Sequence, residues 1–571
     1  MSDVYQKIKS DALIKWNDFN TEKPWIRVGG GVSGQASGSE EIFELIKKYK
    51  KNQNLDFNLS LVGSLGLMYL EPIIDITTPD GVRIYYSKVD QISIEEIIYN
   101  HLELQKPLLD KAFAYSGNLQ TNIIPEIDSL EVMKLQKKIV TKNFGNIDPK
   151  DIDQYIANGG YEALDQALND HTAEEIVNQV KNSGLRGRGG AAFNTGLKWS
   201  FLAPAKAKDK YVLCNCEEGD PGAFNDKGIL ESDPHTLIEG LIINGYATNS
   251  TKGYVFIRHG HEHPIEATKT AIDQAYKKGL LGENILGSGF SFDMEVAFTG
   301  DSYVAGEETA LMEAIEGKRS TPRFKPPFPA AAGLWQKPTN INNVKTLSYV
   351  PSIITNGPNW FKTVGTETTT GTALICLSGH IERPGLYEIE MGMTIKDVIY
   401  DVGGGGSNGQ NIKVLQAGGP LNGLLGVSAF ETKIDFDEMT KAGASIGSGG
   451  IIVGNDETDI VDLLRNLIAF NQFESCGKCF PCRLGNTHML EILDRMCENR
   501  ANSKDMELIE KIGTSMKVGS LCGHGQLGYN PISSALRYFE DDINNCLEGK
   551  YKLSGPFGNG TMIRPTRTRP D

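Results

Sequence analysis

The feature that most constrains this fold is a regular alternation of apolar strands and amphipathic helices after residue 181. The predicted elements are strand 211–216, helix 234–249, strand 253–259, helix 264–278, strand 292–299 and helix 308–317. Strands that alternate with helices pair in parallel, because each helix carries the chain back across the sheet. Ligands of such sheets bind beyond the carboxyl ends of the strands. Residues 215–220 and 300–308 are therefore expected at a ligand site.

Composition narrows the function classes. The 571 residues are 40% hydrophobic and 23% charged, as in ordinary globular proteins. A chain this long should divide into roughly three to five domains. The net charge of −15 argues against nucleic acid as a partner, and only residues 564–569 are locally basic. Because no long apolar run and no signal peptide are recognisable, we expect no transmembrane segment and a cytoplasmic location.

A glycine-rich stretch, residues 183–199, precedes the first of these strands. Its glycines let the backbone approach a ligand closely, and Arg186, Arg188 and Lys198 are interleaved with them. This pattern indicates a loop that holds an anionic ligand, although an isolated glycine cluster is also typical of a plain turn. The stretch fits the dinucleotide fingerprint only formally, because a helix over 172–181 precedes it where the fingerprint needs a strand.

The cysteines carry the strongest chemical signal. Three of the nine are spaced three positions apart and a fourth follows later in the chain: Cys476, Cys479, Cys482 and Cys522. This pattern predicts a 4Fe-4S cluster, with a zinc site as the alternative. The other five are expected to be buried or incidental thiols, namely Cys214, Cys216, Cys376, Cys497 and Cys546.

Three histidines stand at alternate positions, His259, His261 and His263. They would share one side of a continuing strand, where they could bind a metal. Pro264 instead indicates that the segment is already a loop entering a helix, so a metal site is the less favoured interpretation.

Several motifs occur in register along residues 159–539. They are the 183–199 loop, VLCNCEEGDPGAF at 212–224, YVAGEETA at 303–310, FKPPFP at 324–329, ESCGKCFPCR at 474–483 and SLCGHG at 520–525. In this order they closely resemble the NADH-binding flavoprotein (diaphorase) subunit of respiratory complex I and of soluble NAD-linked hydrogenases and formate dehydrogenases.

The resemblance implies an FMN and NAD(H) site. It places Gly187, Gly189 and Lys198 at the FMN phosphate and ribityl chain, Asn215 and Glu217 at the isoalloxazine, with Gly306 and Glu307 beside it, and Asn342, Asn343 and Thr346 at the phosphate. Glu307 and Glu308 would face the nicotinamide as catalytic residues, and a solvated pair at a helix start is their ordinary alternative.

The resemblance also implies an aromatic pair that stacks the NADH adenine, Phe193 and Phe328, with Lys325 near the dinucleotide. Without the resemblance both phenylalanines would be assigned to the core. The remaining cofactor-binding residues implied are Glu218, Asp220 and Tyr303. Asp220 replaces a glutamate of the complex I pattern, and Cys216-Glu217 replaces its Ala-Asp.

An α/β multidomain chain is expected. The predicted divisions are a thioredoxin-like module at 1–118, a helical linker at 119–180, a Rossmann-like FMN/NADH domain at 181–365, a β-grasp (SLBB-type) domain at 366–455, a helical 4Fe-4S domain at 456–550 and a tail at 551–571. In relatives whose module holds a 2Fe-2S cluster, cysteines stand where this chain has Ser64 and Met68. We therefore expect a degenerate module that serves as a docking platform.

The implied function is electron transfer between NAD(H), FMN and a 4Fe-4S cluster within a larger oxidoreductase. Expected partners are a small 2Fe-2S thioredoxin-like subunit and a larger one that oxidises formate or hydrogen, with ferredoxin as a further candidate if electrons are bifurcated. Glu217, Glu218, Glu307 and Glu308 predict a preference for NADH, because their negative field opposes the 2′-phosphate of NADPH. The alternative function is a non-catalytic assembly subunit with a zinc site.

Overall fold

The computed structural model describes residues 1–298 and 300–550, so the predicted tail at 551–571 lies outside the described residues. A parallel sheet of four strands in the order β8-β7-β6-β9 forms its centre. The predicted strands are confirmed as β6 (Tyr211–Cys216), β7 (Lys252–Ile257) and β8 (Asp293–Ala297). The fourth, β9 (Thr339–Asn343), was not predicted, because its sequence TNINN has the composition of a turn.

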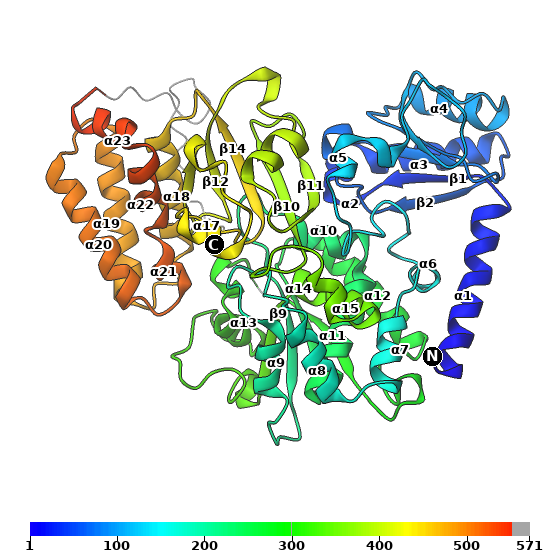
Figure 1. Cartoon of the computed structure of the whole chain (residues 1–571), viewed down its shortest axis with the longest axis horizontal. Helices are drawn as coiled ribbons and strands as arrows, with labels where there is room; N and C mark the ends of the chain where they lie inside the picture. The colour runs from blue at the N-terminus through cyan, green and yellow to red at the C-terminus, as the bar shows by residue number, and fades with distance from the viewer. Residues whose placement is uncertain (299, 551–571) are drawn as a thin grey trace.

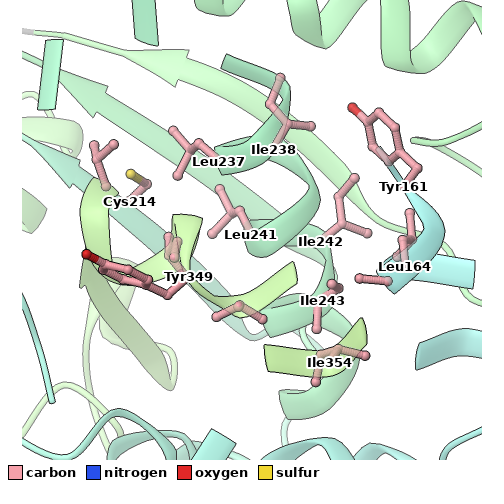
Figure 2. Close-up of a cluster of buried hydrophobic side chains, with 14 of the residues drawn as sticks. Tyr161, Leu164, Cys214, Leu237, Ile238, Leu241, Ile242, Ile243, Tyr349 and Ile354 are labelled. Atoms are coloured by element: carbon pink, nitrogen blue, oxygen red, sulfur yellow. The ribbon is translucent and has the colours of Figure 1, made fainter. Parts of the chain in front are cut away.

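Helix α11 (Pro234–Thr248) packs against this sheet as the most deeply buried helix of the domain. Its side chains Leu237, Leu241 and Ile242 interlock with neighbouring elements in the main hydrophobic core (Figure 2). The predicted helices at 264–278 and 308–317 are confirmed as α12 (Glu262–Lys277) and α13 (Glu308–Ile315). The predicted helix at 172–181 is confirmed as α8 (Ala173–Asn182). Thr172 and Glu175 form a capping box at its first turn.

The N-terminal module contains a second sheet in the order β2-β1-β3-β4-β5. Its strands are β1 (Trp25–Gly29), β2 (Asn58–Val62), β3 (Ile74–Thr77), β4 (Arg83–Tyr86) and β5 (Ala112–Ser116), with β1 and β2 parallel and the other pairs antiparallel. Helix α3 (Ser39–Asn52) covers it. Helix α1 (Asp3–Thr21) precedes this module and packs along the linker region 119–180 (Figure 1), where the Tyr5 hydroxyl donates to the Gly160 carbonyl at 2.8 Å.

The predicted linker is a strap that contains the short helices α5 (Glu131–Lys134), α6 (Ile152–Ala157) and α7 (Glu162–Asn169) and most of α8. Between α5 and α6 it runs as irregular chain, and there Glu388 of β11 (Gly385–Glu390) holds it. The buried Glu388 carboxylate accepts from the backbone N–H groups of residues 139, 140 and 141 at 2.9–3.1 Å.

The next sheet has the order β11-β10-β14-β12-β13. Its other strands are β10 (Thr372–Gly379), β12 (Ile412–Ala417), β13 (Leu424–Gly426) and β14 (Gly450–Asn455). Segment 394–401 is mostly helical, with η7 at Asp397–Val402. In Figure 1 this sheet lies between the N-terminal module and the C-terminal helices.

The chain continues into helices α18 (Ile460–Glu474), α19 (Phe480–Cys497), α20 (Ser503–Gly519), α21 (Gly523–Leu527), α22 (Asn530–Tyr538) and α23 (Glu540–Leu547). The apolar periodicity at 459–472, 487–498, 504–517 and 531–540 predicts four of them. Helix α19 begins well before its predicted start, because Pro481 occupies a first-turn position that tolerates proline. Cys482 therefore sits on a helix, while Cys476 and Cys479 precede it. Among the described helices none is both long and apolar enough to cross a bilayer.

Candidate functional site

The carboxyl end of β6 meets the turn that follows β8. Asn215 Nδ2 donates to the Gly306 carbonyl at 2.8 Å, and Asn215 Oδ1 accepts from the Glu217 backbone N–H at 3.0 Å. A Cβ atom at Gly306 would lie 3.1 Å from Glu217 Oε2, so the two segments approach closely. The structure thus brings Asn215, Glu217 and Gly306 together, as parallel-sheet topology requires.

The glycine-rich loop packs over the end of β9. The Arg188 backbone N–H donates to Thr346 Oγ1 at 2.9 Å, and Asn343 caps α14 (Val344–Ser348). A Cβ atom at Gly189 would lie 2.8 Å from Asn343 Cβ, closer than real side chains come. Asn342 is buried and accepts from Trp199 Nε1 at 3.4 Å. The loop, Asn343 and Thr346 therefore form one continuous surface of backbone and amide groups.

Two of the three cations expected to hold an anion are used elsewhere, which corrects the sequence prediction. Arg186 forms an ion pair with Asp437 at 3.2 Å. The buried Arg188 guanidinium donates to the carbonyls of Thr370 at 2.6 Å and Thr372 at 3.1 Å. Backbone carbonyls at the start of β10 compete for these donors, and sequence spacing does not show that contact.

Lys198 is the cation that remains at the site. Its Nζ donates to the Ile341 carbonyl at 2.6 Å and lies 3.3 Å from Glu308 Oε2. Lys325 Nζ lies 2.6 Å from Glu308 Oε1 and 3.1 Å from Glu307 Oε1. Burial alone would raise the pKa of Glu308, but the two ammonium groups hold it below its usual value.

Glu307 and Glu308 occupy the start of α13. Glu307 is its N-cap, with Oε2 accepting from the N–H groups of Thr309 at 2.9 Å and Ala310 at 3.0 Å. The predicted alternative, a carboxylate pair at a helix start, therefore describes their local structure. The solvent exposure that this alternative implies is not found, because both carboxylates are half-buried and face two lysines.

Glu217 and Glu218 differ in their surroundings. Burial raises the pKa of Glu217 to about 8, against the opposing effect of its ion pair with Arg258. Glu218 accepts from the Asp226 N–H at 2.8 Å and the Lys227 N–H at 2.9 Å, at the start of α10 (Asn225–Ser232), and burial raises its pKa to about 7. Both carboxylate oxygens of Glu218 thus accept hydrogen bonds from backbone N–H groups in the first turn of α10.

The two predicted stacking rings are exposed, Phe193 at 47% and Phe328 at 60% of their surface. The alternative prediction that both phenylalanines belong to the core is therefore wrong. The ring of Phe193 lies 6.3 Å from that of Phe201. Exposed aromatic rings beside a polar site can stack on a planar ligand.

The cysteines Cys476, Cys479, Cys482 and Cys522 line one cavity, with Val304, Ser475 and His524 in its wall. Burial raises the pKa of the Cys482 thiol to about 12 and that of Cys522 to about 11. Within residues 1–298 and 300–550, no three metal-binding side chains converge as a single ion needs, and this holds for His259, His261 and His263 too. Four thiols around a cavity suit a cubane better than a tetrahedral zinc ion with four sulfurs at about 2.3 Å. The other five cysteines are buried, as predicted.

Three side chains that the sequence did not single out complete this region. Arg258 follows β7 and pairs with Glu217. Phe470 and His524 contact the ring of Tyr303 with centroid distances of 5.2 and 5.7 Å. Only the position of Arg258 at a strand end, and of His524 two residues after Cys522, could have signalled them.

Comparison with known proteins decides the family. The Nuo51 FMN-binding domain family matches residues 180–352, the SLBB domain family 374–424, and the NADH-ubiquinone oxidoreductase-F iron-sulfur binding region 462–546. The NADP-reducing hydrogenase subunit HndC of Solidesulfovibrio fructosivorans is 44% identical over 417 residues, which cover 73% of this chain and 85% of the relative.

The chain belongs to the family of FMN-binding, iron-sulfur subunits of NADH-quinone oxidoreductase. The homologous NADH-quinone oxidoreductase subunit of Escherichia coli is 37% identical over 414 residues, 72% of this chain and 92% of that one. A homologue of the same name in Rhizobium meliloti is 42% identical over 401 residues, 70% and 95% of the two chains. The structure of an NAD⁺-reducing [NiFe]-hydrogenase in the H₂-reduced state shares the fold, with a TM-score of 0.64, 23% identity, and coverage of 95% and 90%.

Family membership establishes the cofactor set as FMN, NAD(H) and a 4Fe-4S cluster, and the function as electron transfer within a larger oxidoreductase. The residues present fit these groups. Gly189 lets the loop backbone pack directly against Asn343, where a side chain would collide, and four thiols line the cysteine cavity. The zinc-binding assembly subunit is therefore set aside.

Proposed function

We propose that the residues gathered at the ends of β6 and β9 hold FMN and NAD(H). The glycine loop with Gly187 and Gly189, and the groups Lys198, Asn342, Asn343 and Thr346, would hold the FMN phosphate and ribityl chain. Asn215, Glu217 and Gly306 would border the flavin ring. This assignment is supported by the position of these groups, which form one surface at the strand ends, where α/β sheets bind ligands.

Glu307, Glu308, Lys325, Phe193 and Phe328 would contact NAD(H). FMN, when bound, exchanges two electrons with the nicotinamide and single electrons with the cluster. The chain's own residues orient the dinucleotide: the exposed rings stack its adenine, and the carboxylates at the start of α13 face the nicotinamide. Glu218, capped onto α10, would support the flavin loop from beneath.

We propose NAD(H), not NADP(H), as the nucleotide of this chain, although the relative HndC is named for NADP reduction. The supporting observation is that the cations on the ligand loops are committed. Arg186 and Arg188 bind Asp437 and backbone carbonyls, Lys325 faces Glu307 and Glu308, and Lys198 is assigned to the FMN. A 2′-phosphate would need a free cation to offset its charge.

Steady-state kinetics with a dye acceptor test this preference. We expect kcat/KM for NADH to exceed that for NADPH by at least about tenfold, because one unpaired ionic contact is worth about 1.4 kcal/mol or more. Equal values for the two nucleotides would overturn the proposal. Release of FAD instead of FMN on heating would overturn the flavin assignment.

The cluster would be held by Cys476, Cys479, Cys482 and Cys522, and it needs a receiver for its electrons. The proposed thioredoxin-like module, residues 1–118, is a poor receiver. Ser64 Oγ donates to Glu71 Oε1 at 2.6 Å and Ser33 Oγ to the same oxygen at 3.1 Å, so hydroxyls stand where thiolates would be needed.

Partner subunits are therefore part of the proposal: a small 2Fe-2S thioredoxin-like subunit and a larger one bearing formate or hydrogen oxidation, with ferredoxin as a further acceptor. A cytoplasmic location fits nine cysteines that are all free thiols. The isolated chain should pass electrons from NADH to dyes but show no formate- or hydrogen-dependent NAD⁺ reduction. Such activity in the single purified chain would contradict the need for partners, and co-purification from native cells would identify them.

The proposed domain boundaries follow the sheets. Strands β1–β5 fall within 1–118, strands β6–β9 within 181–365, and strands β10–β14 within 366–455. The strap occupies 119–180 and the cluster helices occupy 456–550. Limited proteolysis should cut preferentially near these limits, because exposed connections between packed units are the preferred sites of nicking.

A further inference from the structure

One short turn connects the flavin loop and the cluster cavity. Helix η5 (Tyr303–Gly306) follows β8, and its first side chain, Tyr303, reaches the flavin loop. The Tyr303 hydroxyl donates to Asp220 Oδ1 at 2.6 Å. The next residue, Val304, lines the cavity of the four cysteines. This turn therefore borders both cofactor sites within two residues.

The Tyr303 ring also contacts the cluster side directly. It lies edge-to-face against His524, with centroids 5.7 Å apart, and His524 lines the cysteine cavity two residues after Cys522. Phe470 of α18 holds the ring from another direction at 5.2 Å. The Tyr303 backbone N–H donates to Glu474 Oε2 at 3.2 Å, just before the first cluster cysteine.

A loop of the β-grasp domain packs against the Asp220–Tyr303 pair. Gly419, which follows β12, has φ +93°, and a Cβ atom there would lie 2.5 Å from Asp220 Cγ. Its carbonyl accepts a hydrogen bond from Gln416, which fixes the loop. The Asp220 carboxylate is thus confined between the Tyr303 hydroxyl and a backbone that only glycine can provide.

We infer that Asp220 and Tyr303, buttressed by Gly419, are positioning residues that set the separation between bound FMN and the 4Fe-4S cluster. Three domains meet at this pair: Asp220 on the flavin loop, Gly419 on the β-grasp loop and His524 on the cluster helices. Because electron transfer falls steeply with distance, a small shift of this contact should slow the passage of an electron from FMN to the cluster. Hydride transfer from NADH needs neither contact. The inference rests on the proposed flavin and cluster sites.

The test is stopped-flow reduction by NADH of the full chain reconstituted with FMN and cluster. Flavin bleaching and the EPR signal of the reduced cluster are followed separately in Gly419→Ala and in a matched control, Gly409→Ala. Gly409 also has positive φ (+72°) and lies in the same domain, but a Cβ atom there would meet nothing within 4 Å. The control therefore carries the backbone strain without the contact to Asp220.

We expect Gly419→Ala to slow cluster reduction relative to Gly409→Ala, because a longer path from FMN to the cluster lowers the electron-transfer rate. The KM for NADH and the rate of flavin bleaching should not change. Tyr303→Phe keeps the ring contacts and loses the hydroxyl, so it should slow cluster reduction more than flavin bleaching, whereas Asp220→Asn keeps an acceptor oxygen and should be milder. Because both residues are also expected at the cofactor site, the ratio of the two rates is the readout for these variants. These two variants provide the test if Gly419→Ala does not fold.

Equal cluster reduction rates in Gly419→Ala, Tyr303→Phe and Gly409→Ala would overturn the inference. A parallel loss of flavin bleaching and cluster reduction would also overturn it, because the pair would then act on flavin binding. Failure of the wild-type chain to bleach its flavin with NADH, or to show a cluster signal, would instead overturn the proposed function.

Discussion

Replacement of Glu388 should loosen the strap from the β-grasp sheet and disturb the glycine-rich loop. The fully buried carboxylate accepts from three backbone N–H groups of residues 139–141, and also from the hydroxyls of Thr141 at 2.8 Å and Thr372 at 2.6 Å. Thr372 in turn accepts from Arg188 through its carbonyl. One side chain therefore joins the strap, β10 and the arginine that shapes the proposed FMN loop.

The expected cost follows from these donors. In Glu388→Ala, three buried N–H groups lose their acceptor, and an unsatisfied buried group costs about 1–3 kcal/mol. Because local relaxation and water entry recover part of that, we expect a loss of about 3–5 kcal/mol in the free energy of unfolding of this unit. Glu388→Gln keeps one acceptor oxygen and should lose about 1–2 kcal/mol.

Thermal unfolding of apo and FMN-loaded protein measures both effects. For a cooperative unit of this size, the alanine variant should unfold roughly 10 °C lower than wild type. It should also bind FMN more weakly, because Thr372, whose carbonyl holds Arg188, loses the hydrogen bond from its hydroxyl to Glu388. Glu431→Ala is the matched control, since Glu431 forms only an exposed pair with Lys396 in the same domain and should change stability by less than about 1 kcal/mol. Equal midpoints for Glu388→Ala and Glu431→Ala would refute the reasoning.

Three further predictions concern the site itself. Cys522→Ala should lose the cluster's iron and visible absorption while retaining FMN; iron content unchanged from wild type would contradict the ligand assignment. Glu308→Gln removes a carboxylate that the proposal places at the nicotinamide, so kcat/KM for NADH should fall; an unchanged value would show that Glu308 does not meet the nicotinamide. Glu217 binds its proton more tightly when folded, with a pKa near 8, so its contribution to stability is present below the unfolded pKa and is lost as pH rises toward 8. Unfolding midpoints of wild type should therefore fall relative to Glu217→Gln over that pH range, and parallel curves would contradict the raised pKa.

The sequence predicted the parallel sheet and the cluster helices well, because both depend on local pattern. Alternating apolar runs and amphipathic periods identified β6, β7, β8 and α11. Strand β9 could not be predicted in the same way. Its side chains are satisfied by neighbours that only the folded chain supplies: Asn340 Nδ2 donates to the Lys198 carbonyl at 3.1 Å, and Asn342 Nδ2 to Asn340 Oδ1 at 2.5 Å.

The arginines show where local pattern ends and tertiary structure decides. Arg186 and Arg188 alternate with glycines and so read as ligands for an anion, yet each is bound to groups of the β-grasp domain. An arginine near a glycine loop can neutralise a ligand or tie the loop to its scaffold, and sequence spacing is identical for both roles. Here the guanidinium of Arg188 donates to the carbonyl of Thr370 and shares the carbonyl of Thr372 with the Tyr349 hydroxyl, at the start of β10. The loop's capacity for an anion must then come from backbone N–H groups, Thr346, Asn343 and Lys198, so Arg188→Lys should weaken FMN binding through loop disorder and not through lost charge.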